Sequence, residues 1–208
     1  MRTILILLLL VSNNLLAQNK NSDFDADVEA LAYQEVLSNT YKNPESSILS
    51  KAQLKDFTAL EFYPLDAKFR VSATFKRTPK AKPFEMMLSS GRTREYVRYG
   101  NANFEIDGVA YNLPIYQNTD YVRNPNQKYG QSLFLPFTDY TSGDGSYGGG
   151  RYIDLELSDI QNGTLTIDFN KAYNPYCAYS SGYNCPIPPE ANDIKVRIEA
   201  GVKDFGKH

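Results

Sequence analysis

The feature that most constrains the fold is a repeated alternation of apolar and polar residues that begins after Pro64. In residues 69–75 every second side chain is apolar, which gives a strand one face in a core and one face in solvent. The same period returns in segments at 84–88, 95–99, 104–106, 109–116, 133–137, 151–157, 165–169 and 194–198. No helical pattern separates these segments, so a parallel sheet of βαβ units is not expected. The pattern predicts a mainly β (α+β) fold, with an antiparallel β-sandwich or barrel-like sheet.

Two dipeptides mark tight turns between predicted strands. Asp107-Gly108 separates two alternating segments, and it supplies the positive φ angles that a two-residue hairpin turn needs. Asn162-Gly163 stands between the segments at 151–157 and 165–169. We therefore expect a hairpin at each of these two turns.

Two helical segments precede the strands. Asp23 is a candidate N-cap, and apolar residues between Phe24 and Leu37 then recur at helical spacing. Ser50, with Gln53 three residues later, forms a capping-box pattern that opens a short second helix. We expect both N-terminal helices to cover the sheet rather than to carry a function.

The first residues have the pattern of a secretory signal. Arg2 precedes an apolar run at 4–11, and Ala17 offers a small residue at the cleavage position. The run is shorter than the about 20 residues that a spanning helix needs. The alternative, a buried N-terminal helix, is disfavoured by the polar residues that follow. We expect residues 1–17 to be a signal peptide and residues 18–208 to be a single mainly β domain, exported as a soluble protein to the periplasm or the cell exterior.

Composition excludes several classes of function. The chain has 22 Lys and Arg against 24 Asp and Glu, so it offers no basic excess for nucleic acid. Its one histidine is His208, the last residue, where a catalytic base would be poorly held. Ser-His-Asp and Cys-His catalysis and zinc binding by Cys and His are therefore not expected. We expect no metal, no cofactor and no membrane span after signal cleavage.

A glycine-rich loop joins the segments at 133–137 and 151–157, and it contains the pattern G-x-G-x-x-G from Gly143 to Gly148. In nucleotide-binding folds a helix follows such glycines, whereas here Arg151 leads into a strand. One interpretation is a tight connection whose glycines adopt backbone angles that other residues avoid. The other is a loop whose backbone N–H groups, with Arg151, bind an anionic or polar ligand.

Four acidic residues lie in the same region, at Asp139, Asp144, Asp154 and Asp168. Two carboxylates can perform acid–base chemistry when one is desolvated and the other stays ionised. Asp154 and Asp168 alternate with apolar neighbours, so we expect both to point away from the core on adjacent strands. Solvated strand residues are the simpler interpretation of both.

Cys177 and Cys185 lie eight positions apart in a chain that we expect to be exported. A disulfide between them is the favoured interpretation. A reactive thiol pair is the alternative, although the spacing is not the C-x-x-C of redox proteins. The tyrosines from Tyr173 to Tyr183 fit ligand contact and packing of this loop onto the sheet equally well.

Several long segments resemble a known family. They are PFTDYTSGDGSYGGGRYIDL, DFNKAYNPYCAYSSGYNCPIPPE and VRIEAG, with FYPLDAKFRVSATF and GRTREYVRYGNANFEIDG upstream. They are similar to the family named domain of unknown function 1684, and the resemblance spans about Tyr33 to Gly206. It implies a single-domain bacterial or archaeal protein with no established activity. The positions that recur in the family correspond here to Pro136, Phe137, Asp139, Tyr147, Gly148, Gly150, Arg151, Asp154, Asp168, Asn170, Tyr173, Asn174, Cys177 and Cys185.

The leading hypothesis is a non-catalytic, exported binding module for a polar or anionic ligand, either a polar small molecule or a component of the cell envelope. The candidate ligand-binding residues are Asp139, Tyr147, Arg151, Asn170, Tyr173 and Asn174. We expect the tyrosine-rich segment to fold beside the glycine-rich loop, so that the Arg151 guanidinium faces a shared hollow. The alternative is a carboxylate-based hydrolase of a cell-envelope substrate that uses Asp139, Asp154 or Asp168 with Arg151. A scaffold protein, with an exposed apolar patch and no pocket, is a third class.

Overall fold

The structure, a computed structural model, describes residues 25–206. The signal peptide expected at residues 1–17 lies outside the described residues. Within 25–206, no helix combines the length and the apolar character that crossing a membrane requires.

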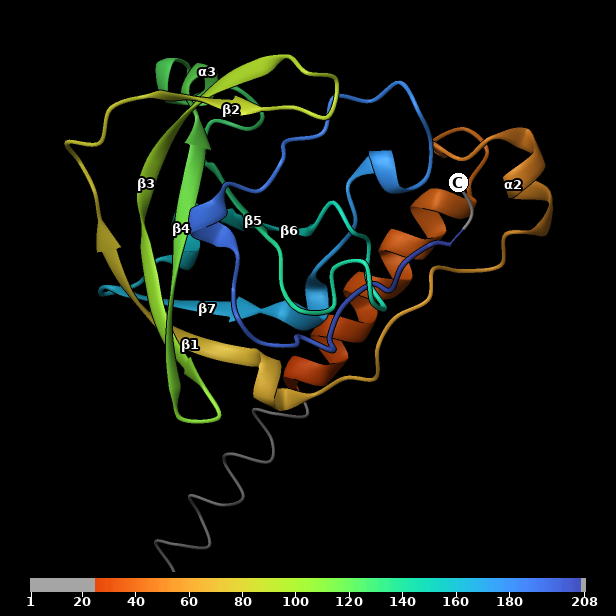
Figure 1. Ribbon diagram of the computed structural model, residues 1–208, viewed down its shortest axis with the longest axis horizontal. Helices are drawn as coiled ribbons and strands as arrows, with labels where there is room; N and C mark the ends of the chain where they lie inside the picture. The colour runs from red at the N-terminus through yellow and green to blue at the C-terminus, as the bar shows by residue number, and fades with distance from the viewer. Residues whose placement is uncertain (1–24, 207–208) are drawn as a thin grey trace, which may run out of the picture.

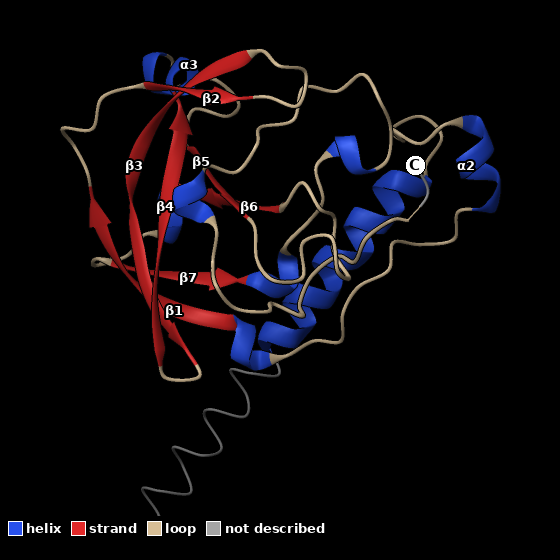
Figure 2. Ribbon diagram, in the orientation of Figure 1, coloured by secondary structure: helices blue, strands red, loops and turns tan. Residues whose placement is uncertain are grey.

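Seven antiparallel strands form one curled sheet that makes a half-barrel (Figures 1 and 2). The strands are β1 (Arg70–Arg77), β2 (Phe84–Met87), β3 (Thr93–Ile106), β4 (Val109–Asn118), β5 (Ser132–Phe137), β6 (Arg151–Glu156) and β7 (Thr164–Asp168). Their order is β6-β5-β4-β3-β1-β7, and β2 pairs with the first residues of β3, Thr93 to Tyr96. The predicted mainly β, barrel-like antiparallel fold is confirmed.

The concave face of the sheet holds the main core. Strand alternation produces it directly: in β1 the side chains of Val71, Ala73 and Phe75 are buried and those between them are exposed. Ile167 of β7 and Phe137 of β5 are fully buried in the same cluster. The apolar residues that the sequence pattern placed on one face of each strand therefore do pack together.

The hairpin predicted at Asp107-Gly108 is confirmed. These residues have φ angles of 52° and 75°, and they join β3 to β4 in continuous register from Ile106 opposite Val109. β3 is longer than the sequence pattern indicated, because the segments at 95–99 and 104–106 join across an irregularity between Arg98 and Gly100.

The second predicted hairpin is wrong. Asn162 and Gly163 do form a tight turn, with φ angles of 51° and 75°, but the strands on either side do not pair with each other. β7 pairs with β1, β6 pairs with β5, and the two strands lie at opposite ends of the sheet order. A short 3-10 helix, Leu157–Asp159, follows β6 and begins at a capping box between Glu156 and Asp159. It turns the chain away from β6 before the dipeptide is reached.

Two N-terminal helices form as predicted, but the expectation that both cover the sheet is wrong for the second, which contacts the tyrosine-rich segment instead. One covers residues 25–42 and the other is α2 (Lys51–Asp56), which begins at the predicted capping box of Ser50 and Gln53. The first helix lies beside the open side of the half-barrel (Figure 2). Its Gln34 side chain donates a hydrogen bond of 2.9 Å to the Asn170 carbonyl oxygen just after β7. A third helix, α3 (Thr119–Arg123), follows β4.

The strand predicted at 194–198 does not form. Ile194 and Ile198 are buried as the alternation requires, but the segment makes isolated contacts instead of a ladder. The Ile198 N–H donates to the Asp139 carboxylate at 2.8 Å rather than to a strand. Four further 3-10 helices complete the fold, at Ala67–Phe69, Phe169–Lys171, Tyr176–Ala178 and Glu190–Asn192.

Cys177 and Cys185 form a disulfide, with sulfur atoms 2.16 Å apart, and the structure contains no free cysteine. The disulfide prediction is confirmed. The bridge closes a short loop in the tyrosine-rich segment that follows β7.

The glycine-rich loop has the backbone angles of a tight connection. Gly150, directly before β6, has φ +86°, and a Cβ at this position would lie 2.6 Å from the Phe137 carbonyl oxygen and 2.8 Å from Pro188 Cγ. Gly108 has a similar φ of +75°, but a Cβ there would meet nothing within 4 Å. A substitution at Gly108 would therefore test backbone strain alone, whereas one at Gly150 would test backbone strain together with steric contact.

We expect Gly108→Ala to cost about 1–2 kcal/mol of unfolding free energy, because of its left-handed backbone. Gly150→Ala should cost more, since it adds contacts too close for a methyl group. Urea denaturation of both variants measures the difference. Equal losses would contradict the close packing of the loop at Gly150.

Candidate functional site

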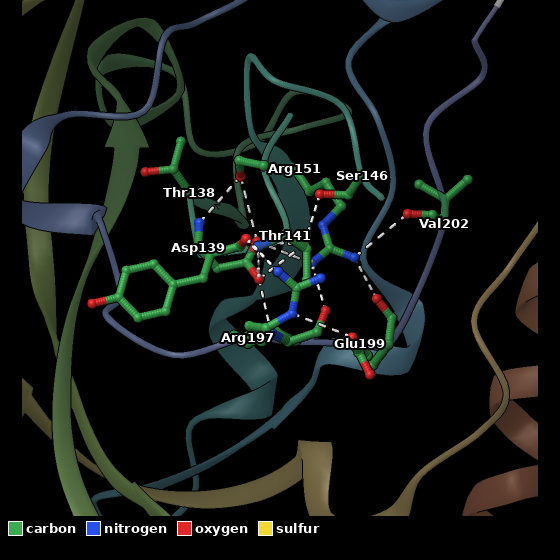
Figure 3. A network of polar contacts seen from close by, with 12 residues as sticks. Thr138, Asp139, Thr141, Ser146, Arg151, Arg197, Glu199 and Val202 are labelled. Carbon is green, nitrogen blue, oxygen red and sulfur yellow. Dashed lines mark hydrogen bonds and ion pairs between the residues drawn. The ribbon is translucent and has the colours of Figure 1, made fainter. Parts of the chain in front are cut away.

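The glycine-rich loop ends at a buried ion pair. Arg151, the first residue of β6, and Asp139, two residues after β5, both have side chains with 0% exposed surface. Arg151 Nη2 lies 3.2 Å from Asp139 Oδ1 (Figure 3). Burial lowers the pKa of Arg151, and the Asp139 carboxylate opposes that change. Alternation accounts for the burial, because Arg151 lies on the same strand face as the core residues Ile153 and Leu155.

Each charged group of the pair has further partners. Arg151 donates to carbonyl oxygens of the C-terminal segment 198–202, including that of Ile198 at 2.8 Å. Asp139 accepts from the Ile198 N–H at 2.8 Å and from the Thr141 hydroxyl at 2.9 Å. The network therefore ties the glycine-rich loop and the start of β6 to the C-terminal segment.

The prediction that the Arg151 guanidinium faces an open hollow is wrong. The predicted neighbourhood of the two loops is correct, because Tyr152 and Tyr173 exchange backbone hydrogen bonds of 2.9 and 3.0 Å. Successive side chains of a strand point to opposite faces, however. Tyr152 therefore meets the tyrosine-rich segment, and Arg151 points into the protein.

Three other candidate residues also have structural surroundings. The buried Asn170 side chain donates to the Asp168 carboxylate at 2.9 Å. The buried Asn174 side chain donates to the Lys203 carbonyl oxygen at 2.9 Å. Tyr147 is half-buried and packs against the apolar cluster between the N-terminal helices and the C-terminal segments. A ligand-binding role for these residues stays a prediction that none of these contacts supports.

We expect Arg151→Met to lower the unfolding free energy by about 3–5 kcal/mol, because it leaves the Asp139 carboxylate buried without a cation. The double variant with Asp139→Asn should lose less than the sum of the two single losses. Urea denaturation of the three variants tests this. A loss within about 0.5 kcal/mol for Arg151→Met would instead indicate an exposed side chain.

A cleft of about 460 Å³ opens where the sheet is not closed. Its two sides are residues 153–155 of β6 and the β7 residues Thr164, Leu165, Thr166 and Asp168. Glu29 and Tyr33, from the helix at 25–42, also line it. A volume in this range suits a small ligand or a short segment of chain. The cleft therefore exists because β6 and β7 do not form the hairpin that the sequence predicted.

Most charged side chains of the cleft already have partners. Lys171 Nζ lies 2.5 Å from Glu29 Oε1, and Arg70 Nε lies 4.0 Å from Asp168 Oδ2. Asp159 accepts a hydrogen bond of 2.8 Å from a backbone N–H at the end of β6. Within residues 25–206, no three His, Cys, Asp or Glu side chains gather closely enough to hold a metal ion.

Asp154, in the middle of β6, differs from these residues. None of the ion pairs within the described part of the chain includes it. Desolvation by the surrounding protein raises the pKa of its carboxyl, a hydrogen bond with the Tyr173 hydroxyl opposes this, and the negative Glu156 adds to it. The side chain is nevertheless exposed to solvent on the cleft wall, so water offsets much of this desolvation. The cleft thus contains a partly desolvated carboxylate without a cation.

Two tyrosines lie close to this carboxylate. Burial raises the pKa of both Tyr33 and Tyr173, and the negative charge of Asp154 raises both further. Their hydroxyls therefore stay protonated and able to donate. Tyr173, a candidate residue from the sequence, contacts a residue of the cleft through its hydrogen bond with Asp154.

Sequence reasoning did not include Asp154 among the ligand-binding candidates. It placed the residue correctly on the outer face of a strand, because Ile153 and Leu155 on either side are apolar. No local pattern shows that the helix carrying Tyr33 lies across that face, since the two positions are far apart in the chain.

We expect Asp154→Asn to raise the thermal midpoint of the ligand-free protein at pH 7. The pKa of Asp154 is higher in the folded protein than in the unfolded chain. Protonation of Asp154 therefore stabilises the fold, and this contribution is fully present below the unfolded pKa of about 3.9. It is lost as the pH rises through the folded-state pKa. An asparagine has no such cost. The gain should therefore shrink as the pH falls toward about 4.

Glu105→Gln, on the exposed face of β3, is the matched control and should change stability by less than about 0.5 kcal/mol. Thermal unfolding at several pH values measures both variants. A lower midpoint for Asp154→Asn at pH 7 would show that the carboxylate has a stabilising partner.

Comparisons with known proteins agree with this fold and report no activity. The model of the family described as protein of unknown function (DUF1684) matches residues 55–203. The solution NMR structure of an uncharacterized protein of Haloarcula marismortui is similar, with a TM-score of 0.69 and 29% identity. The match covers 90% of this chain and 99% of that chain. No curated protein matches the chain.

Proposed function

The chain belongs to the family described as protein of unknown function (DUF1684), and we propose that it binds a polar ligand with a positive charge in the cleft between β6 and β7. One observation carries the proposal: Asp154 is a carboxylate on the wall of the cleft that forms no ion pair within residues 25–206. A cationic group of a ligand would supply the missing partner, and a charge-assisted hydrogen bond in such surroundings is stronger than one in water.

The charge of the cleft favours this ligand over an anion. Among the side chains that line it, Glu29, Asp154, Asp159 and Asp168 oppose two cations, which gives a formal charge of −2. The anionic ligand of the sequence-based hypothesis has no support here, because Arg151 is committed to the buried network. The polar ligand of that hypothesis is kept.

A hydrolase is the second candidate, and the raised pKa of Asp154 is the observation that favours it. Such an enzyme needs a second carboxylate that is free to act. Asp168 accepts from the Asn170 backbone N–H at 3.0 Å, and Asp159 is bound to a backbone N–H at the end of β6. Because these carboxylates are occupied, binding accounts for the site better than hydrolysis.

We also propose that the protein acts outside the cytoplasm. The disulfide between Cys177 and Cys185 supports this location, because such bonds persist in oxidising compartments. The signal-like sequence at residues 1–17 supports it independently. A polar component of the cell envelope therefore fits as a source of the ligand.

We expect L-argininamide, a small dication, to bind the mature protein at pH 7. Asp154→Asn should weaken this binding at least about tenfold, because it removes the charged partner of the ligand. Affinity should fall as pH decreases through the raised pKa of Asp154, because protonation removes the negative charge. Isothermal titration calorimetry measures both effects. Glu105→Gln, outside the cleft, should bind as the parent does.

Equal affinity of Asp154→Asn and parent would contradict the proposed site. Assays with chromogenic glycosides and esters separate the second candidate. Turnover by the parent that is lost in Asp154→Asn would assign the cleft to a hydrolase instead.

A further inference from the structure

We infer that the ligand of this cleft is an extended peptide with a basic side chain, which adds as a strand to the free edge of β7. This inference rests on the proposed function, because the same cleft and the same Asp154 carboxylate would bind the basic group. What it adds is main-chain recognition by the two strand edges that face the cleft.

The register of β7 shows which of its backbone groups are free. The Phe75 N–H of β1 donates to the Gly163 carbonyl oxygen at 2.8 Å. In an antiparallel pair the hydrogen-bonded residues alternate, so Leu165 and Ile167 face β1. Thr166 therefore directs its backbone N–H and C=O groups, and Asp168 its N–H, to the other side, where both residues line the cleft. The Asp168 carbonyl oxygen is the N-cap acceptor of the 3-10 helix at 169–171.

The edge of β6 is shorter. The Leu157 N–H donates to the Gln131 carbonyl oxygen at 2.9 Å, so by the same alternation Asp154 directs its backbone groups away from β5. Tyr152 is already paired with Tyr173 on that side. β6 thus offers the two backbone groups of Asp154 to the cleft, and β7 offers those of Thr166 with the N–H of Asp168, which makes β7 the edge for strand addition.

The side chains of the cleft complement a basic peptide. In an added strand, the residue opposite Thr166 would point its side chain to the same face of the sheet as Thr166. That face is the exposed one, because Ser72, the β1 residue opposite Thr166, is exposed. The Asp154 side chain lies on the exposed face of β6, on the far side of the same cleft. A Lys or Arg at that position of the peptide would thus approach a carboxylate that has no cation.

Unpaired strand edges beside a cleft are a known means of peptide capture, in which main-chain hydrogen bonds give affinity and side-chain contacts give specificity. A small cation would use Asp154 and leave the N–H and C=O groups of Thr166 and the N–H of Asp168 to water. An extended peptide would use both sets of groups. β6 and β7 run in opposite directions in this sheet, so an added strand can be antiparallel to β7 and parallel to β6.

The test is fluorescence polarisation with a labelled, capped pentapeptide of sequence Thr-Val-Lys-Val-Thr at pH 7. We expect it to bind at least about tenfold more tightly than argininamide, the effect of a few added main-chain hydrogen bonds. The same peptide with its central backbone nitrogens methylated should lose this gain, because methylation removes donors and keeps the lysine. Replacing the lysine by alanine should also weaken binding.

Variants of Thr166 test the protein side. Thr166→Pro removes the backbone N–H that faces the cleft and leaves the hydrogen bonds between β7 and β1 in place. An edge strand tolerates proline at a position of this kind. It should lose peptide binding and keep argininamide binding. Thr166→Val keeps the N–H and removes the hydroxyl, so it should bind the peptide as the parent does. Thermal unfolding confirms that both variants are folded.

The outcomes separate the two proposals. Argininamide binding that depends on Asp154, with no gain for the peptide or no loss on methylation, would overturn the strand addition and leave the proposed function standing. Peptide binding that Thr166→Pro leaves unchanged would place the peptide elsewhere and overturn the inference. Absence of binding by both probes would overturn both proposals.

Discussion

The pairing of β7 with β1, and not with β6, is the constraint on which the candidate site depends. A hairpin between β6 and β7 would close the sheet and fill the space that the cleft occupies. β7 is held by its ladder with β1, where Leu165 and Ile167 reach the core. β6 is held at its first residue, Arg151, whose side chain donates hydrogen bonds to the C-terminal segment. The two strands are therefore fixed apart at their far ends, although the connection between them is short.

The structure treats Asp139 and Asp154 in opposite ways. Asp139 is fully buried, and it has a cation, a hydroxyl and backbone N–H groups as partners. Burying an ion pair costs desolvation energy, which is recovered when the remaining hydrogen-bonding groups are also satisfied. Asp154 lies on the exposed face of β6 and has one hydroxyl partner, from Tyr173. The first carboxylate organises loops that are distant in sequence, and the second is left able to accept a ligand.

Much of the fold follows from local sequence. Alternation predicted the strands, Asp107-Gly108 predicted its hairpin, and Ser50 with Gln53 predicted the start of α2. These features depend on neighbours a few residues away. The same alternation, continued by one step to Arg151, places this residue on the core face. The expectation of an exposed guanidinium followed instead from the interpretation of the adjacent glycine-rich loop as a ligand-binding loop.

The site was predicted less well because it depends on long-range pairing. Which strand lies beside β7 is decided by packing across the sheet, and the turn at Asn162-Gly163 is compatible with either neighbour. The partners of Arg151 at residues 198–202 are too distant in sequence for any local pattern to show. The same holds for Tyr33 beside Asp154. The chemistry of these residues is visible in the sequence, but their neighbours are not.

Hydrogen exchange of backbone amides, followed by NMR, tests the unclosed sheet most directly. In the ligand-free protein we expect fast exchange for the amides of Asp154 and Thr166, which face the cleft. We expect slow exchange for their neighbours Leu155 and Ile167, which bond within the sheet. Slow exchange at both Asp154 and Thr166 would mean that these edges are already paired, and it would contradict a cleft between β6 and β7.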